Sequence, residues 1–363
     1  MDWKSLYRER LMSAEDAVRK IGPKSRIYTS HAAAAPTTLL QAMGDRYEWF
    51  DQVTLFNILL LGEAPFCKPE AAEHLRYQTI FTSAPTREAV NAGRADYIPA
   101  SYSEVPSLVR GTLRADVALL SVSPPDAHGF CSFGLTCDYQ RAAAQTAGLV
   151  IAEVNRQMPR VHGDNMIAVE DIDCFVEVDR PLPQMAPAKI GEVERAIGAH
   201  CASLIHDGDT LQLGIGAIPD AVLLSLKDKK DLGIHSEMFS DGVVELMEAG
   251  VVTNKRKTLL PGVSVSTFLM GSDRLYRFVD DNPAVALYPV DFTNDPRIAC
   301  QNDNLVAINS CIQVDLYGQV AADMLGMRQF SGTGGQIDFV RSANMSRGGR
   351  AIIAMPSTAA KGT

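Results

Sequence analysis

One glutamate in this sequence stands where a carboxylate could act on a bound ligand. In the segment from Gly233 to Gly242 we expect an apolar strand to end near Glu237, with Ser240 or Asp241 capping the helix that follows. Open α/β sheets bind ligands at the carboxyl ends of their strands, which is where this carboxylate would lie. Glu237 could be a nucleophile, a general base or a salt-bridge partner, and the residue type alone favours the salt bridge.

A glycine-containing turn is predicted earlier in the same half of the chain, where Gly214 and Gly216 stand between Leu213 and Pro219. Glycine permits positive φ and lets a ligand approach the backbone, and the helix N-terminus behind the turn leaves N–H groups unpaired. Such a turn suits a phosphate or the oxyanion formed on a thioester under attack. It lacks the third glycine of a dinucleotide fingerprint and the lysine of a P-loop, so neither nucleotide motif applies.

A second glycine-rich segment holds three glycines in four positions, at Gly332, Gly334 and Gly335. A flexible surface loop is the commoner fate of such a stretch. However, Ile337 to Val340 resembles the start of a packed helix or strand, which favours a backbone that a ligand approaches closely. The arginines that follow, Arg347 and Arg350, could contact phosphates or only water.

Other chemistries lack support in the sequence. The seven histidines, at positions 31, 74, 128, 162, 200, 206 and 235, show no metal-ligand spacing, and we interpret His235 as a structural hydrogen-bonding residue. Asp126 and His128 could be read as half of a hydrolase triad, but no G-x-S-x-G elbow accompanies them. We interpret their segment as a rigid turn that could line a substrate cleft.

Composition bounds the class of protein. The chain has 363 residues, 46% hydrophobic and 21% charged, which suits two globular α/β domains. A net charge of −9 argues against a nucleic-acid surface. No apolar run reaches the length of a membrane span. The 7 cysteines form no C-x-x-C pair and the N-terminus lacks a signal-peptide layout, so we expect a cytoplasmic protein with reduced thiols.

The elements that must position these residues alternate as βα units do. We expect strands at residues 25–30, 53–61, 116–122 and 148–154, with a helix beginning at Pro36. Residues 179–187 contain three prolines in seven positions and predict a linker. After it we expect a helix over 190–206, a strand over 209–213 and a helix over 219–226.

Two segments of the first half recur in the second. The stretch from Thr29 to Pro36 precedes a helix as Leu213 to Pro219 does. Val117 to Ser121 is followed by Asp126 and Gly129, and residues 306–310 by an aspartate and a glycine, Asp315 and Gly318, at the same offsets. These repeats predict two related α/β domains with mainly parallel sheets, at residues 1–185 and 186–363.

Taken together, the motifs resemble the acetyl-CoA hydrolase / 4-hydroxybutyrate CoA-transferase family, within the glutamate-dependent class I type CoA-transferases. The strongest match runs from Asp231 to Gly242. Further matches cover nearly the whole chain and lie at Gly93 to Pro99, Ser123 to Gly134, Leu213 to Asp220, Ser331 to Phe339 and Ala351 to Thr358.

The resemblance implies a homodimer or higher homo-oligomer with an active site between two domains, and no metal or permanently bound cofactor. It implies that Glu237 is the catalytic carboxylate. It also implies that the earlier turn binds CoA, through Leu213, Gly214, Ile215, Gly216 and Ala217. The later glycine segment, with Gly332, Gly334 and Gly335, would lie close to the thioester. Members of the family run on past the point at which this chain stops, so the C-terminal domain is expected to be truncated.

The implied activity is transfer of CoA between an acyl-CoA and a small carboxylic acid, by ping-pong through a glutamyl-CoA thioester on Glu237. Acetate, butyrate and 4-hydroxybutyrate are all compatible acceptors, and loops 100–106 and 124–133 are expected to shape their pocket. Two alternatives stay open. Water could resolve the intermediate, as in an acyl-CoA hydrolase, or the chain could be a non-catalytic CoA-binding subunit.

Overall fold

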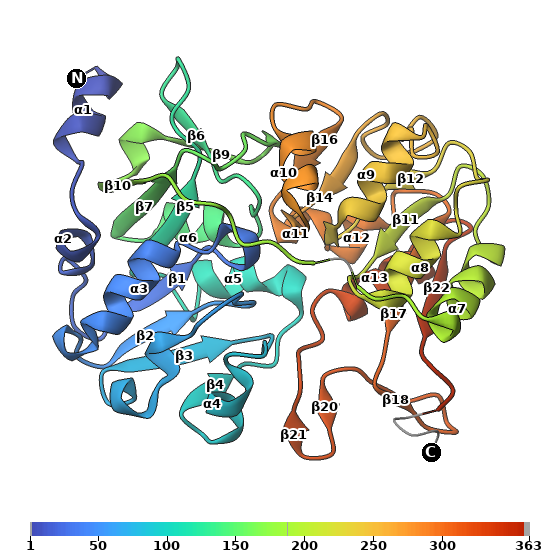
Figure 1. Cartoon of the computed structure of the whole chain (residues 1–363), viewed down its shortest axis with the longest axis horizontal. Helices are drawn as coiled ribbons and strands as arrows, with labels where there is room; N and C mark the ends of the chain where they lie inside the picture. Colours follow the sequence, from blue (N-terminus) through green and yellow to red (C-terminus); the bar gives the residue numbers. More distant parts are fainter. Residues whose placement is uncertain (1, 187, 359–363) are drawn as a thin grey trace.

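The computed structural model describes residues 2–186 and 188–358 of the chain. Its two halves lie side by side, the first from blue to green and the second from yellow to red in Figure 1. Their principal sheets are parallel, which confirms the predicted α/β class. Pro187 of the predicted linker and residues 359–363 of the predicted C-terminal domain lie outside the described residues.

The first half is built on a seven-stranded sheet in which every neighbouring pair is parallel. Its strands, in spatial order, are β10 (Cys174–Val178), β7 (Leu149–Asn155), β5 (Val117–Val122), β1 (Arg26–Thr29), β2 (Val53–Phe56), β3 (Leu75–Thr79) and β4 (Ala95–Tyr97). Every residue of β5 is buried, as expected for a parallel strand covered on both faces. The expected strand over 53–61 ends early, at Phe56.

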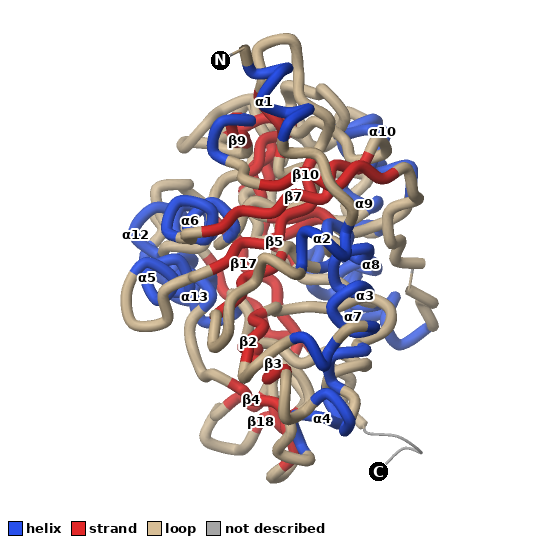
Figure 2. Tube along the Cα trace, turned by 90° about the vertical axis from the view of Figure 1, so that its left-hand side faces the viewer, coloured by secondary structure: helices blue, strands red, loops and turns tan. Residues whose placement is uncertain are grey.

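The helices of the first half cover both faces of this sheet, with α2 and α3 on one side and α5 and α6 on the other (Figure 2). The α-helices are α1 (Trp3–Glu9), α2 (Ala14–Val18), α3 (Thr37–Asp45), α4 (Arg87–Asn91), α5 (Val105–Arg110) and α6 (Gln140–Thr146). Short 3-10 turns lie at η1 (Ala32–Ala34), η2 (Tyr47–Trp49), η3 (Pro65–Cys67), η4 (Pro69–Ala71), η5 (Tyr102–Glu104) and η6 (Val169–Asp171). Two short antiparallel strands, β6 (Phe130–Ser132) and β9 (Met166–Ala168), flank the sheet.

The second half repeats this plan with fewer strands. Its parallel sheet contains β12 (Gly233–Ile234), β11 (Thr210–Leu213), β17 (Leu305–Ser310) and β22 (Arg350–Ala354), in that order. The order β22-β17-β11-β12 matches β7-β5-β1-β2 of the first half. The predicted sequence repeats fall on equivalent strands, because β5 and β17 each neighbour the strand that precedes the repeated turn.

The remaining elements of the second half surround this sheet and join it to the first half. Its α-helices are α7 (Glu192–Ser203), α8 (Ala217–Leu224), α9 (Asp241–Glu248), α10 (Asp273–Val279), α11 (Val290–Thr293), α12 (Pro296–Ala299) and α13 (Gln336–Met345). Strand β14 (Ser264–Ser266) pairs in parallel with β16 (Val285–Leu287), and β16 pairs in parallel with β8 (His162–Gly163), which comes from the first half. Two small antiparallel hairpins are β18 (Gln313–Val314) with β19 (Val320–Ala321) and β20 (Met324–Leu325) with β21 (Arg328–Gln329).

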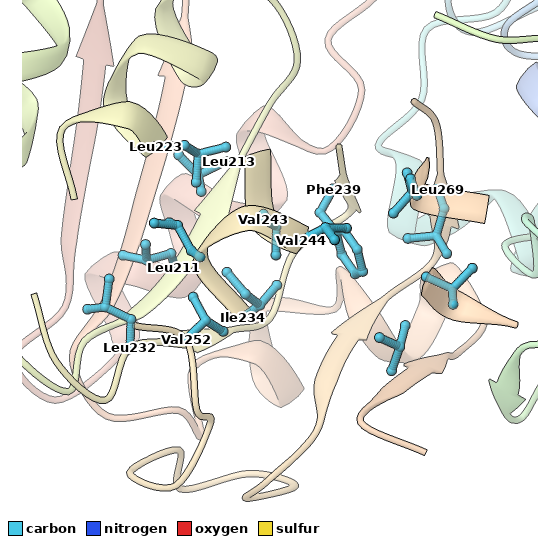
Figure 3. Close-up of a cluster of buried hydrophobic side chains, with 14 of the residues drawn as sticks. Leu211, Leu213, Leu223, Leu232, Ile234, Phe239, Val243, Val244, Val252 and Leu269 are labelled. Atoms are coloured by element: carbon cyan, nitrogen blue, oxygen red, sulfur yellow. The ribbon is translucent and has the colours of Figure 1, made fainter. Parts of the chain in front are cut away.

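The core of the second half supports the strand that leads to Glu237. Leu211 and Leu213 of β11 and Ile234 of β12 pack with Val243 and Val244 of α9 (Figure 3). These five side chains are at most 2% exposed. Burial of this kind contributes about 1.5–3 kcal/mol for each large aliphatic side chain, so the end of β12 is held firmly in place.

Candidate active site

A cavity of about 430 Å³ lies between the two halves. The first half contributes an apolar wall together with one tyrosine. The second half contributes the glutamate, both glycine segments and several side-chain amides. The lining residues used below are Ile58, Leu59, Ile80, Phe81, Tyr102, Gln212, Leu213, Gly214, Ile215, Glu237, Asn309, Gly332, Gly334, Gly335 and Gln336.

Glu237 lies where the chain passes from one small sheet to another. β12 ends at Ile234, and the next strand, β13 (Met238–Phe239), pairs instead with β15 (Phe268–Leu269). The backbone carbonyl of Glu237 accepts hydrogen bonds from the N–H groups of Thr267 at 2.9 Å and Phe268 at 3.2 Å. The backbone is therefore fixed on one side while the partly exposed side chain faces the cavity. A helix follows, as predicted, and α9 begins at Asp241, but neither Ser240 nor Asp241 caps it through a side chain, because the Asp241 carboxylate accepts from Ser272 instead.

The carboxyl group of Glu237 is poised between its neutral and charged forms. Burial raises its pKa to about 7, and the nearby carboxyl groups of Asp338 and Asp138 add to the rise. Asn294 opposes it, because Asn294 Nδ2 donates a hydrogen bond to Glu237 Oε2 at 2.8 Å. The group is thus half ionised near neutral pH, and Asn294 orients its charged form.

The glycines of the second segment leave the space that this carboxylate needs. A Cβ atom on Gly335 would lie 2.0 Å from Glu237 Oε2 and 2.3 Å from Asn294 Nδ2. Gly334 has a φ of 51°, and a Cβ there would lie 3.4 Å from Glu237 Oε1. A Cβ on Gly332 would lie 2.2 Å from the carbonyl oxygen of Ile80 in the first half. All three predicted glycines therefore lie against Glu237 or the opposite wall.

Asp338 connects this glycine segment to the first half. It lies in the first turn of α13, is buried, and accepts hydrogen bonds from the Ser103 N–H at 3.0 Å and the Ser103 hydroxyl at 2.9 Å. Burial raises the pKa of Asp338 to about 6, and the bonds from Ser103 oppose that rise. The contact fixes α13 against the loop that carries Tyr102.

The earlier turn meets the cavity only in part. Leu213, Gly214 and Ile215 line it, whereas Gly216 and Ala217 are not among its lining residues. Gly216 has a φ of 113° and precedes α8, which begins at Ala217. Within residues 2–186 and 188–358, no side chain accepts a hydrogen bond from the first turn of α8.

Several other predicted residues have structural roles. His235 is buried and its Nε2 lies 2.8 Å from the carbonyl oxygen of Thr293, while burial lowers its pKa to about 3; it is structural, as interpreted. Arg347 pairs with Asp303 and Arg350 with Asp209, so both arginines already contact acids.

The turn at Asp126 is rigid, as interpreted, because its carboxylate accepts from the N–H groups of His128 at 2.8 Å and Phe130 at 3.0 Å. The expectation that loop 124–133 shapes the pocket is wrong, since none of its residues lines the cavity. The turn instead packs under Trp3, whose ring leaves no room for a Cβ on Gly129. Of the two loops expected to shape the pocket, only 100–106 contributes, through Tyr102.

Sequence reasoning missed Asn294, Asp338 and the apolar wall at Ile58, Leu59 and Phe81. Asn294 is 57 residues from Glu237 in sequence and stands in no recognisable motif. A polar residue in the first turn of the expected element after Gly335 could have drawn attention to Asp338. The apolar wall carries no sequence signal at all, because its residues look like ordinary core.

Metal-ligand clusters and membrane-spanning helices are both absent from the described residues. Across 2–186 and 188–358, no three His, Cys, Asp or Glu side chains gather closely enough to hold a metal ion. Over the same ranges, none of the helices combines the length and the apolar character needed to cross a bilayer.

Comparison with known proteins places the chain among enzymes of one kind. The model of the acetyl-CoA hydrolase/transferase N-terminal domain matches residues 1–185, and that of the C-terminal domain matches residues 271–363. A protein of Clostridium kluyveri named 4-hydroxybutyrate coenzyme A transferase is 53% identical over 363 residues, covering 100% of this chain and 85% of the relative.

Two solved structures are similar over 100% of this chain and 85% of their own. The crystal structure of 4-hydroxybutyrate CoA-transferase from Porphyromonas gingivalis is 43% identical with a TM-score of 0.87. That of RipA from Yersinia pestis is 38% identical with a TM-score of 0.93.

Proposed function

The chain belongs to the acetyl-CoA hydrolase/transferase family, and from that premise we propose that it transfers CoA from an acyl-CoA to a carboxylic acid through a covalent intermediate on Glu237. The observation that supports this most is the Glu237 carboxyl group. It lines the cavity between the halves, it is oriented by Asn294, and its pKa is raised to about 7.

In the first half-reaction the ionised carboxylate of Glu237 attacks the thioester carbonyl. The C–S bond breaks, CoA leaves as its thiolate, and an acyl-glutamyl anhydride forms. The thiolate then attacks the glutamyl carbonyl of the anhydride, which releases the first carboxylate and leaves a glutamyl-CoA thioester. A second carboxylate reverses these steps and departs as the new acyl-CoA.

Burial makes the carboxylate a better nucleophile once it is charged, because fewer water molecules solvate it. The glycine segment from Gly332 to Gly335 leaves room for the Glu237 carboxylate, and its backbone would let the acyl group approach beside it. The turn at Leu213, Gly214 and Ile215, with the unoccupied first turn of α8 behind it, would bind CoA. Gly216 and Ala217 would contribute their backbone N–H groups at the start of that helix.

The substrate class follows from the relatives. The Clostridium kluyveri protein is named for 4-hydroxybutyrate, and a relative in Anaerostipes caccae, 32% identical, is named butyryl-CoA:acetate CoA-transferase. We therefore propose acetate, butyrate and 4-hydroxybutyrate as exchanging acids. The apolar side chains of Ile58, Leu59 and Phe81 suit a short aliphatic chain.

Intact mass spectrometry tests the covalent mechanism. Protein incubated briefly with acetyl-CoA, without an acceptor acid, should release acetate and gain the mass of one CoA less one water, and Glu237→Ala should gain none. Glu73→Gln, which changes an exposed carboxylate, is the control and should form the adduct. An unmodified wild type that leaves acetyl-CoA intact would contradict the proposal and favour a binding subunit.

The hydrolase alternative is separated by following release of CoA with and without added acetate. Transfer requires that a labelled acid appear as its CoA ester. Release that ignores the acid would identify a hydrolase instead. The homo-oligomer, the cytoplasmic location and the domain limits at residues 185 and 186 stay predictions.

A further inference from the structure

Two side-chain amides face each other in the wall of the cavity. Gln212 lies on β11 and Asn309 on the neighbouring parallel strand β17. Asn309 Nδ2 donates to Gln212 Oε1 at 2.9 Å, and Gln212 Nε2 donates to Asn309 Oδ1 at 3.4 Å. Both residues line the same cavity as Glu237. The mechanism above uses neither of them.

This position is an unusual one for amides. Residues around the pair on the two strands, such as Leu211, Leu213 and Val306, are apolar and buried, as expected for parallel strands covered on both faces. A buried amide costs free energy unless its polar atoms find partners. Within the described residues, each of these two amides has the other as its side-chain partner. Each therefore retains one N–H and one carbonyl lone pair for a ligand.

The ligand chemistry follows from the contrast between the cavity walls. The wall that comes from the first half, with Ile58, Leu59 and Phe81, offers apolar surface. The hydroxyl group of Tyr102 on that side is already engaged, because it donates to Asp138. The pantetheine arm of CoA contains two secondary amides, each with one N–H and one C=O, which need partners when the arm leaves water.

We propose that Gln212 and Asn309 form the subsite that binds the pantetheine amides of CoA. Gln212 stands two residues before Gly214, on the strand that leads into the turn assigned to CoA, and Asn309 lies on the neighbouring strand. The inference deepens the proposed function, since it rests on CoA entering this cavity. It assigns the polar wall to the arm and leaves the apolar wall to the acyl group.

Calorimetric binding of three probes tests the subsite without turnover: CoA, pantetheine alone, and the adenosine bisphosphate end of CoA alone. Gln212→Leu and Asn309→Leu should each weaken the binding of CoA and pantetheine about tenfold, while the nucleotide fragment binds as it does to wild type. Gln78→Leu is the matched control. Gln78 is also a strand amide, with Nε2 donating to Asp96 at 3.2 Å, but it does not line the cavity.

Three results would overturn the inference. One is that pantetheine binds both variants as tightly as wild type. Another is that the binding of all three probes weakens together, as expected of a pair with a structural role only. A rise in the KM for 4-hydroxybutyrate, with pantetheine binding unchanged, would assign the pair to the acid instead. Failure of the proposed function gives a different result from failure of this inference. In that case the wild type would still bind pantetheine through Gln212, but it would transfer no CoA between acids.

Discussion

The two halves of the molecule share one strand order, but they differ in what lies at the N-terminus of the helix after the repeated turn. In the first half, β1 leads to α3, whose N–H groups at Thr38 and Leu39 donate to Glu153 Oε2 at 2.9 and 3.2 Å. In the second half, β11 leads to α8, and no described side chain accepts from its first turn. One helix N-terminus is thus occupied by a carboxylate of the protein, and the other has no such side-chain partner among the described residues.

The residue that faces the helix start differs between the two halves. Glu153 lies on β7 opposite Ser121 of β5. The repeated segment places Ser310 of β17 where Ser121 stands, and opposite Ser310 on β22 lies Ala354. Alanine cannot reach or neutralise a helix N-terminus, whereas glutamate can do both. The same frame therefore has one helix N-terminus closed by a glutamate, and under the proposed function the other is open to CoA, with an alanine at the corresponding position.

Removing the carboxylate from the first half should have the largest effect. Glu153 is fully buried and also accepts from Arg180 Nη2 at 2.6 Å, so Glu153→Ala leaves a partly buried cation and two N–H groups without their partner. We expect a loss of about 3–5 kcal/mol in the free energy of unfolding, measured by urea denaturation.

Glu194→Ala is the matched control, because Glu194 accepts from the Gly191 N–H of α7 at 2.9 Å but lies at the surface. It should cost only about 1 kcal/mol. Equal losses in the two variants would show that burial of Glu153 does not matter.

The second-largest effect is expected when the space beside Glu237 is filled. Gly335→Ala places a methyl group 2.0 Å from Glu237 Oε2, so the carboxylate must move away from Asn294. Misplacement of about 1 Å lowers the rate roughly a hundredfold, and we expect at least that loss in kcat for CoA transfer. Gly22→Ala, where the nearest atom would be Ser25 Oγ at 3.6 Å, should retain wild-type kcat. An active Gly335→Ala enzyme would argue against the assigned role of Glu237.

Placing in the second half the carboxylate that the first half has should weaken CoA binding. Ala354→Glu introduces the carboxylate that Glu153 supplies elsewhere, and its negative charge should compete for the first turn of α8. We expect the KM for acetyl-CoA to rise about tenfold relative to Ala354→Gln, which adds the same bulk without charge. If both variants raise KM equally, bulk alone explains the effect and the equivalence of the two positions fails.

The smallest effect is expected in the pH dependence of the open site. Because the pKa of Glu237 is raised to about 7, its carboxyl group is still protonated below that pH and only the ionised form attacks. The kcat/KM for acetyl-CoA should therefore fall about tenfold per pH unit below 7. Asp338→Asn removes a negative charge that raises this pKa, so the fall should begin at lower pH.

Asp228→Asn, at an exposed site, should leave that profile unchanged. The assay must cover roughly pH 5.5 to 8. If the kcat/KM of the wild type does not change over that range, Glu237 does not titrate in this step.

Local patterns in the sequence determined a good part of this protein. Alternation of apolar runs and amphipathic stretches predicted the strands β1, β5, β7 and β11 and the helices α3 and α8 that follow β1 and β11, because each element buries its own apolar face. The offsets of Asp315 and Gly318 predicted a repeat, and both copies prove to lie on equivalent strands. The glycines at Gly332, Gly334 and Gly335 marked close backbone approaches, because only glycine leaves that space.

Only the tertiary structure decided what surrounds those residues. The orientation of Glu237 depends on Asn294, and the occupation of α3 depends on Glu153, which is 115 residues from Thr38. Packing also brought Ile58 and Phe81 of the first half to the wall opposite Glu237. Charge state and ligand access depend on burial and on partners distant in sequence, and no local pattern encodes which distant side chain fills a given space.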